Sequence, residues 1–260
     1  MNRTSACWRR SQKPERSRSP MKDPAPGRSA SPSACESCWV SPVLPEGEPA
    51  VDAWRAVDER EFVELVLSCA GTPAGRPRIV AVDGRGAAGK STLAARLTDA
   101  VPNSAVVHTD DLAWNEPFFA WGHLLTLVLE SLHGGHSAHL EPPAWTIHGR
   151  QGAIEVPSGL DLVVVEGVGA SQREHVHLLD ATLWVQSDFD EAETRGIARD
   201  IEQGSNGQEN ETVAFWHEWM EHELRFLAQQ QPWHRADLVV AGTSVMPLRT
   251  GQLAVVLGPL

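Results

Sequence analysis

The chain of 260 residues has no tyrosine, only four cysteines, and no apolar run that approaches 18 residues. A membrane-spanning helix needs about 20 consecutive apolar residues, so the sequence predicts no such helix. The basic N-terminus has no apolar centre, so we expect no secretory signal. Three of the cysteines (Cys7, Cys35 and Cys38) lie within the first 40 residues, which argues against a disulfide framework. We therefore expect a reducing, cytoplasmic location.

Positive charge is scarce outside the N-terminus. The formal net charge is −12, with +5 on residues 1–40 and −17 on the rest of the chain. An acidic body argues against nucleic acid or a membrane as the main partner. It does not exclude a nucleotide, because a local nest of backbone N–H groups binds phosphates regardless of net charge.

The composition divides the chain into a tail and one domain. Residues 1–50 are rich in Ser, Pro and Arg and lack hydrophobic periodicity, so we expect a disordered tail with too little apolar surface to join a core. Met21 is an alternative start. Cys35 and Cys38 have zinc-site spacing, but no second pair follows, and we interpret them as free thiols. Residues 51–260 are predicted to form one α/β domain.

Residues 78–96 have the pattern of a strand, a glycine loop and a helix, in which Gly84, Gly89, Lys90 and Ser91 fill the motif G-x-x-x-x-G-K-S. Such a loop turns its N–H groups toward phosphate oxygens, and the positive end of the helix faces the same anion. Lys90 is expected to reach the β/γ-phosphates and Ser91 to bind Mg²⁺. The alternative is a plain glycine-rich turn. The residues predicted to contact the nucleotide are Gly84, Arg85, Gly86, Ala87, Ala88, Gly89, Lys90, Ser91 and Thr92.

Acidic residues follow two further predicted strands. Asp110 and Asp111 come after the strand 104–108, and Glu166 closes the apolar strand 160–167. Chemistry in open α/β sheets takes place at the carboxyl ends of strands, so these residues are candidates for a base and for metal ligands. The alternative for Asp110 or Asp111 is a cap on the following turn.

The remaining segments alternate between helical and strand patterns. Residues 51–70 and 120–132 are predicted helices, 181–186 is a strand, and 188–203 is a helix with Arg195 and Arg199 on one face. We predict that residues 188–210 form a lid whose arginines reach the transferring phosphate; the alternative is two solvated arginines. A helix over 211–229 and strands over 236–241 and 253–257 complete a doubly wound, largely parallel sheet.

The segment 112–150 is rich in aromatic residues and histidine. Its Trp114, Phe118, Phe119, Trp121 and Trp145 fit either an acceptor pocket or core packing. The spacing of His133, His136 and His139 suggests a metal site. The glycines between the first two and the lack of a nearby cysteine or acidic pair argue against it.

The phosphate loop, the DD strand end, the VVVEG strand and the ETRGIARD helix occur in an order that resembles the uridine kinase/phosphoribulokinase-like family of P-loop kinases. The similarity covers about residues 76–243. Within the family, the chain looks most similar to actinobacterial-type members labelled uridine kinase or ATP-binding protein. It implies a P-loop NTPase-type three-layer α/β fold with a helical lid. It also implies that Asp110 is the base, that Glu166 helps to hold Mg²⁺, and that Arg195 and Arg199 are lid arginines.

The expected function is an ATP-dependent kinase that transfers the γ-phosphoryl group to a hydroxyl of a small molecule. The expected catalytic residues are Asp110, Lys90, Arg195 and Arg199, and the expected Mg²⁺ residues are Ser91, Asp110 and Glu166. The expected acceptor is a nucleoside such as uridine, and the alternative acceptor is a sugar-like or vitamin-like alcohol. An NTP hydrolase and a non-catalytic nucleotide-binding module are the alternatives, although no NKxD motif is present. Nucleic acid and membranes are not expected as partners, and homo-oligomerisation is left open.

Overall fold

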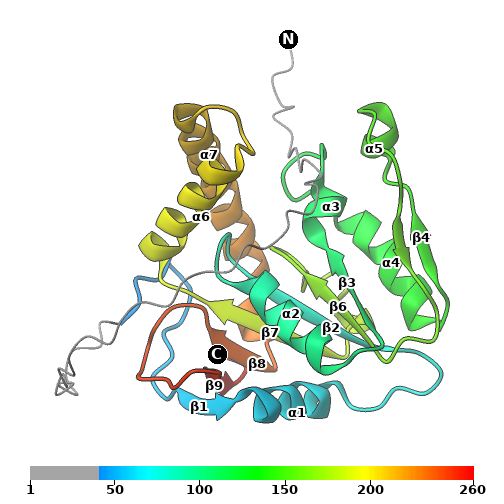
Figure 1. Ribbon diagram of the computed structural model, residues 1–260, viewed down its shortest axis with the longest axis horizontal. Coiled ribbons are helices and arrows are strands. Elements are labelled where there is room, and N and C mark those ends of the chain that lie inside the picture. The colour runs from blue at the N-terminus through cyan, green and yellow to red at the C-terminus, as the bar shows by residue number, and fades with distance from the viewer. Residues whose placement is uncertain (1–40) are drawn as a thin grey trace, which may run out of the picture.

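The computed structural model describes residues 41–260, which form a seven-stranded sheet flanked by helices (Figure 1). The strand order is β1-β9-β8-β7-β2-β6-β3. Five adjacent strands are parallel, namely β8 (Leu238–Ala241), β7 (Ala181–Gln186), β2 (Arg78–Gly84), β6 (Leu162–Glu166) and β3 (Ser104–His108). Antiparallel pairing adds β9 (Gln252–Leu257) and β1 (Arg55–Asp58). The predicted α/β fold with a largely parallel sheet is confirmed.

The phosphate-loop strand lies inside this sheet because both of its faces are apolar. β2 lies between β7 and β6, and all of its residues after Arg78 are buried. On one face the sheet packs against α1 (Glu59–Ala70) and α2 (Lys90–Ala100). On the other face it packs against α4 (Gly122–His133). A parallel strand covered on both faces has no need of polar alternation, and β2 shows none.

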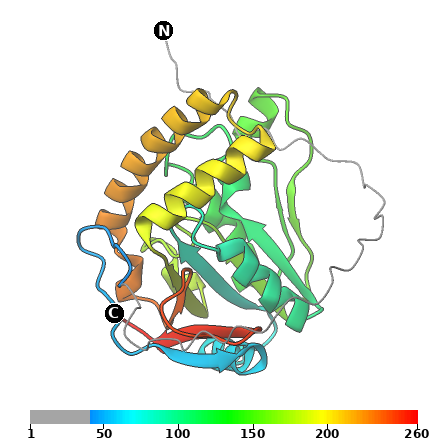
Figure 2. The same cartoon turned by 60° about the vertical axis from the view of Figure 1, so that its left-hand side comes forward.

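Two long helices stand beyond the sheet, and the first of them, with the turn after it, spans the predicted lid over residues 188–210. α6 (Phe189–Gln203) follows β7, and α7 (Glu209–Gln230) packs against it (Figure 2). Asp188 caps α6 by accepting a hydrogen bond from the Glu191 N–H. The side chains of Gln208 and Glu211 form a capping box at the start of α7.

Several short elements complete the fold. They are α3 (Thr109–Ala113), β4 (Ala138–Leu140), α5 (Pro143–Ile147), β5 (Ile154–Val156) and the 3-10 helices η1 (Val176–Leu178) and η2 (Pro232–His234). β4 and β5 pair with each other outside the main sheet. Sequence patterns did not predict this pair, because three residues are too few to show a period of two. In the part of the chain that the structure describes, none of the helices is long and apolar enough to cross a membrane.

The predicted helix over 51–70 is wrong in its first part. Residues 55–58 form β1, which pairs with β9 at the edge of the sheet, and the helix begins only at Glu59. The Asp58 carboxylate accepts a hydrogen bond from the Glu61 N–H and so caps the helix. Apolar residues at Trp54 and Val57 fit both interpretations, and only the distant partner strand decides between them.

The tail boundary at residue 50 also needs correction. Residues 41–50 lie against the domain, where the Val43 N–H donates to the Asp188 carboxylate at 2.7 Å and Glu48 is buried. This attachment depends on polar contacts, so hydrophobic periodicity did not reveal it. The cysteine pair at 35 and 38, the alternative start at Met21 and the rest of the predicted tail lie outside the described residues.

Candidate functional site

The phosphate loop lines a cavity of about 1500 Å³ at the carboxyl ends of the parallel strands. Its lining residues come from the loop and α2, from α3 and residues 148–151, and from α6 and α7, whose arrangement Figure 1 shows. Gly89 is left-handed, with φ of 102°, and starts α2 without a capping side chain, so the helix presents free amides to an anion. Ala87 is also left-handed, with φ of 56°, a conformation that costs a non-glycine residue energy and is typical of functional loops.

Seven of the nine residues predicted to contact the nucleotide line this cavity, and they span 86–92. Lys90 is buried, and its Nζ donates to the Arg85 carbonyl oxygen at 2.7 Å. Gly84 and Arg85 do not line the cavity. The Arg85 side chain is directed away from it and pairs with buried Glu48.

The side chains of Ser91 and Glu166 are in contact, and both residues line the cavity. The Ser91 hydroxyl donates to Glu166 Oε1 at 3.1 Å, and His108 Nδ1 lies 2.8 Å from Glu166 Oε2. Burial would raise the pKa of Glu166, but the hydrogen bond from His108 and the charge of Lys90 outweigh it, and the pKa is lowered. An ionised carboxylate beside a hydroxyl offers the oxygen ligands that Mg²⁺ prefers. Among residues 41–260, no group of three or more His, Cys, Asp or Glu side chains forms a metal site.

Asp110 and Asp111 have different environments, although they are adjacent. Asp110 is exposed and lines the cavity, where neighbouring protein atoms partly desolvate its carboxylate. This desolvation raises the pKa of Asp110; the charge of Glu166 raises it further, and Lys90 opposes both. Asp111 instead accepts a hydrogen bond from Arg150 Nη2 at 2.6 Å. Asp110 is therefore the carboxylate that faces the phosphate loop.

The two arginines of the predicted lid, Arg195 and Arg199, line the cavity from α6. Arg195 Nε donates to the Ala87 carbonyl oxygen at 2.9 Å, so α6 contacts the phosphate loop directly. Arg199 Nε donates to Asp200 Oδ1 at 2.9 Å, and buried Asp200 also accepts a hydrogen bond from the Trp216 indole. The structure thus brings the predicted arginines, the loop and Asp110 to one cavity.

The predicted aromatic segment divides between the cavity and the core. Trp114 lines the cavity and packs edge-on against His148, at 6.1 Å between ring centroids. Trp121 and Trp145 are buried in the core. Phe118 packs against Trp219 of α7, and Phe119 stacks on Phe226. Aromatic residues of α7 also line the cavity, namely Phe215, Trp216 and Trp219.

Sequence reasoning missed three residues at this site. His108 ends β3 beside Glu166, because β3 and β6 pair in register at these two residues. Arg150 lies over the Trp145 ring, 3.5 Å from its centroid. Glu223 of α7 is buried and accepts a hydrogen bond from the Gly86 N–H of the phosphate loop at 2.7 Å. Only His108, one position before the predicted catalytic segment, gave a sequence signal, and that signal was its place at a strand end.

No protein-family model and no curated protein matches the sequence. Among solved structures, D-glycerate 3-kinase from Cryptococcus neoformans var. grubii matches with a TM-score of 0.51 at 14% identity, over 70% of this chain and 94% of that chain.

Two further structures match less well. A protein from Silicibacter sp. TM1040, provisionally named a fructose transport system kinase, has a TM-score of 0.45 at 18% identity, over 64% of this chain and 94% of that chain. A protein from Bacillus stearothermophilus, provisionally named a uridine kinase, has a TM-score of 0.41 at 16% identity, over 69% of this chain and 97% of that chain. At 14% identity the likeness to the D-glycerate 3-kinase concerns the α/β fold alone.

Proposed function

We propose that this protein is an ATP-dependent kinase that transfers the γ-phosphoryl group to a hydroxyl of a small molecule. The observation that supports this most is the convergence on one cavity of the phosphate loop, Asp110, the Ser91–Glu166 pair, and two arginines of α6. These groups come from four separate segments of the chain. A glycine-rich turn without a function would not need them together.

Each group has a role in phosphoryl transfer, which depends on positioning and on stabilisation of charge. The loop amides and the Lys90 ammonium bind the phosphates, and Lys90 exchanges its bond to the Arg85 carbonyl for a phosphate oxygen. Ser91 and Glu166 fit Mg²⁺, which neutralises phosphate charge when bound. Arg195 and Arg199 extend from α6 toward the transferring group and hold its equatorial oxygens.

Asp110 accepts the proton of the acceptor hydroxyl. As the new bond forms between the acceptor oxygen and the γ-phosphorus, the bond from that phosphorus to the bridging oxygen breaks, and ADP leaves with the electron pair. The raised pKa of Asp110 suits this role, because a more basic carboxylate takes up a proton more readily.

The acceptor binds at the end of the cavity that Trp114 and Arg150 line. Trp114 lines the cavity with the Arg150 guanidinium over its ring, and the Asp111–Arg150 pair offers hydrogen-bond acceptors and donors beside it. An aromatic face next to polar groups suits a nucleoside or a sugar-like ring. Uridine is the first candidate, and other sugar-like or vitamin-like alcohols are the next.

An ATP-consumption screen with identification of products tests this proposal. The wild-type chain is incubated with Mg·ATP and a panel of nucleosides, sugars, vitamin-like alcohols and D-glycerate, the last included for the kinase of similar fold. We expect one class of acceptor to gain a phosphate, with one ADP formed per product. ADP and inorganic phosphate without a phosphorylated acceptor would favour a hydrolase, and failure to bind ATP would refute the proposal altogether.

A further inference from the structure

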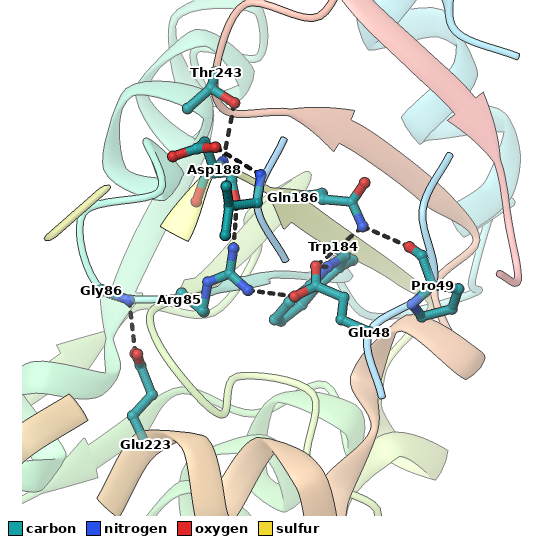
Figure 3. A network of polar contacts seen from close by, with 11 residues as sticks. Glu48, Pro49, Arg85, Gly86, Trp184, Gln186, Asp188, Glu223 and Thr243 are labelled. Atoms are coloured by element: carbon teal, nitrogen blue, oxygen red, sulfur yellow. Dashed lines mark hydrogen bonds and ion pairs between the residues drawn. The ribbon is translucent and has the colours of Figure 1, made fainter. Parts of the chain in front are cut away.

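Residues 41–50 cross the carboxyl end of β7 and insert Glu48 into the protein beside the phosphate loop (Figure 3). Glu48 Oε1 accepts hydrogen bonds from Trp184 Nε1 at 2.9 Å and from Gln186 Nε2 at 3.1 Å. Gln186 also donates to the Pro49 carbonyl oxygen at 2.9 Å. Two polar side chains of β7, those of Trp184 and Gln186, therefore fix the position of Glu48.

The other Glu48 oxygen pairs with Arg85, the second residue of the phosphate loop. The Glu48 side chain is 1% exposed and that of Arg85 is 3% exposed, so the two charges meet away from water. Arg85 also donates to the Ser187 carbonyl oxygen. A buried charge is tolerated when it is paired, and Glu48 provides the carboxylate for this guanidinium.

The same segment holds the start of the lid helix. The Val43 N–H donates to the Asp188 carboxylate, and the Val43 carbonyl accepts from the Phe189 N–H at 2.9 Å. Further along α6, Arg195 bonds the Ala87 carbonyl of the loop. The segment, the loop and α6 are thus connected in a closed series of contacts.

We propose that Glu48 is a positioning residue for nucleotide binding, and that residues 41–50 set the geometry of the phosphate loop and of the start of α6. Arg85 connects Glu48 to the loop, because its side chain is anchored outside the cavity. The backbone from Arg85 to Ala87 therefore keeps the conformation in which the Lys90 ammonium bonds the Arg85 carbonyl. From the opposite side, the loop is held by Glu223 through the Gly86 N–H (Figure 3). This inference rests on the nucleotide site proposed above.

The sign of the expected effect distinguishes positioning from simple charge. Removing a negative charge near a phosphate site tightens binding of an anion if only Coulomb attraction matters. If Glu48 positions the loop, Glu48→Gln weakens binding instead, because the Arg85 guanidinium loses its partner and draws the loop out of place.

The test is calorimetric titration of Mg·ATP and Mg·ADP into the full chain at a temperature where all variants are folded. We expect Glu48→Gln to raise the Kd about tenfold, in the range typical of coupling between sites. Glu46→Gln is the matched control, since it removes the same charge from the same segment at an exposed position. We expect its Kd to stay within about twofold of the wild type.

Trp184→Phe is a second variant, which keeps Glu48 and removes the indole N–H bond to it, together with part of the ring that packs against Trp233 in the core. It decides the question if Glu48→Gln does not fold, and we expect a Kd about threefold above the wild type. Unchanged or tighter binding in the folded variants, even with a lowered thermal midpoint, overturns the inference and leaves Glu48 with a structural role. Absence of nucleotide binding by the wild type overturns the proposed function together with the inference, and so differs from a failure of the inference alone.

Discussion

Glu166 and Asp110 are neighbouring carboxylates whose surroundings shift their pKa values in opposite directions. The hydrogen bond from His108 and the charge of Lys90 hold the pKa of Glu166 below its ordinary value despite burial. Desolvation and the nearby Glu166 raise the pKa of Asp110. Titratable groups whose pKa values are pushed apart by their surroundings often divide into a charge stabiliser and a proton acceptor. In this site, Glu166 suits the cation and Asp110 suits the hydroxyl proton.

Asp110→Asn tests this division of roles. With an acceptor identified, we expect its turnover to fall by about 10² to 10⁴, because the amide cannot accept the proton. Its ATP affinity should change little, since the loop and Lys90 are untouched. Glu166→Gln should instead raise the Mg²⁺ concentration needed for half-maximal rate. Wild-type turnover by Asp110→Asn would show that another group is the base.

His175 gives a prediction about stability and pH. Its imidazole is fully buried, and burial lowers the pKa of His175 to about 4 from 6.5. Protonation therefore favours the unfolded chain, so this contribution to stability is complete above about pH 6.5 and is lost as the pH falls toward 4. Between pH 7 and pH 5 the loss amounts to about 2 kcal/mol.

Urea unfolding of the wild type and of His175→Leu at both pH values measures this contribution. The difference in unfolding free energy between pH 7 and pH 5 should be smaller in the variant by about 2 kcal/mol. Identical pH dependence in the two proteins would mean that His175 does not titrate in this way. The comparison between proteins removes the contribution of the many carboxylates that also titrate in acid.

Among the elements, those with a local signal could be predicted and those that depend on distant partners could not. The run from Ile79 to Val82 and the glycines after it identify β2 and the phosphate loop without further information. The strand β1 depends on pairing with β9, almost 200 residues away in the sequence. The position of Glu48 depends on Arg85 and Trp184, and no pattern within 41–50 indicates either partner. Arg150 and Glu223 escaped prediction for the same reason.

Residues 41–50 lead to a prediction that reverses the one from the sequence. The sequence alone predicts that a chain starting at Val51 is as stable as the full chain. The structure predicts that this chain loses several degrees of thermal midpoint, since Arg85 remains buried without its carboxylate. A chain starting at residue 41 should match the full-length midpoint in differential scanning calorimetry. Equal midpoints for all three chains would show that the segment contributes nothing to the fold.

The packing of α6 on α7 depends on a small residue at Gly196. A Cβ there would lie 2.1 Å from the Trp216 ring, so the two helices approach too closely for any side chain. Gly196→Ala should destabilise the fold by about 1 to 3 kcal/mol through overpacking and displace Arg195 and Arg199. Denaturant unfolding measures the first effect and the rate with the acceptor the second. Ala198→Gly changes one methyl group at an exposed position of the same helix, and so measures the effect of helix propensity without the contact to Trp216.

At the scale of the whole molecule, the strand order gathers the site. β2 lies between β7 and β6, and β3 lies beyond β6, so the phosphate loop, Glu166 and Asp110 emerge at the same edge of the sheet. The helix α6 follows β7 at that edge and brings its arginines over the loop. Each group alone has an ordinary structural explanation. Their meeting in one cavity carries the proposal of a phosphoryl-transferring enzyme.

The measurement that tests this account most directly is a calorimetric titration of Mg·ATP into the wild type and Lys90→Ala. The Lys90 Nζ donates one hydrogen bond, to the Arg85 carbonyl oxygen, and a single such bond contributes little to stability, so Lys90→Ala should lower the thermal midpoint only slightly. We expect that the wild type binds Mg·ATP and that Lys90→Ala binds it at least about tenfold more weakly, since the ammonium offsets phosphate charge. Equal affinity in the two proteins, or no binding by the wild type, would contradict this account.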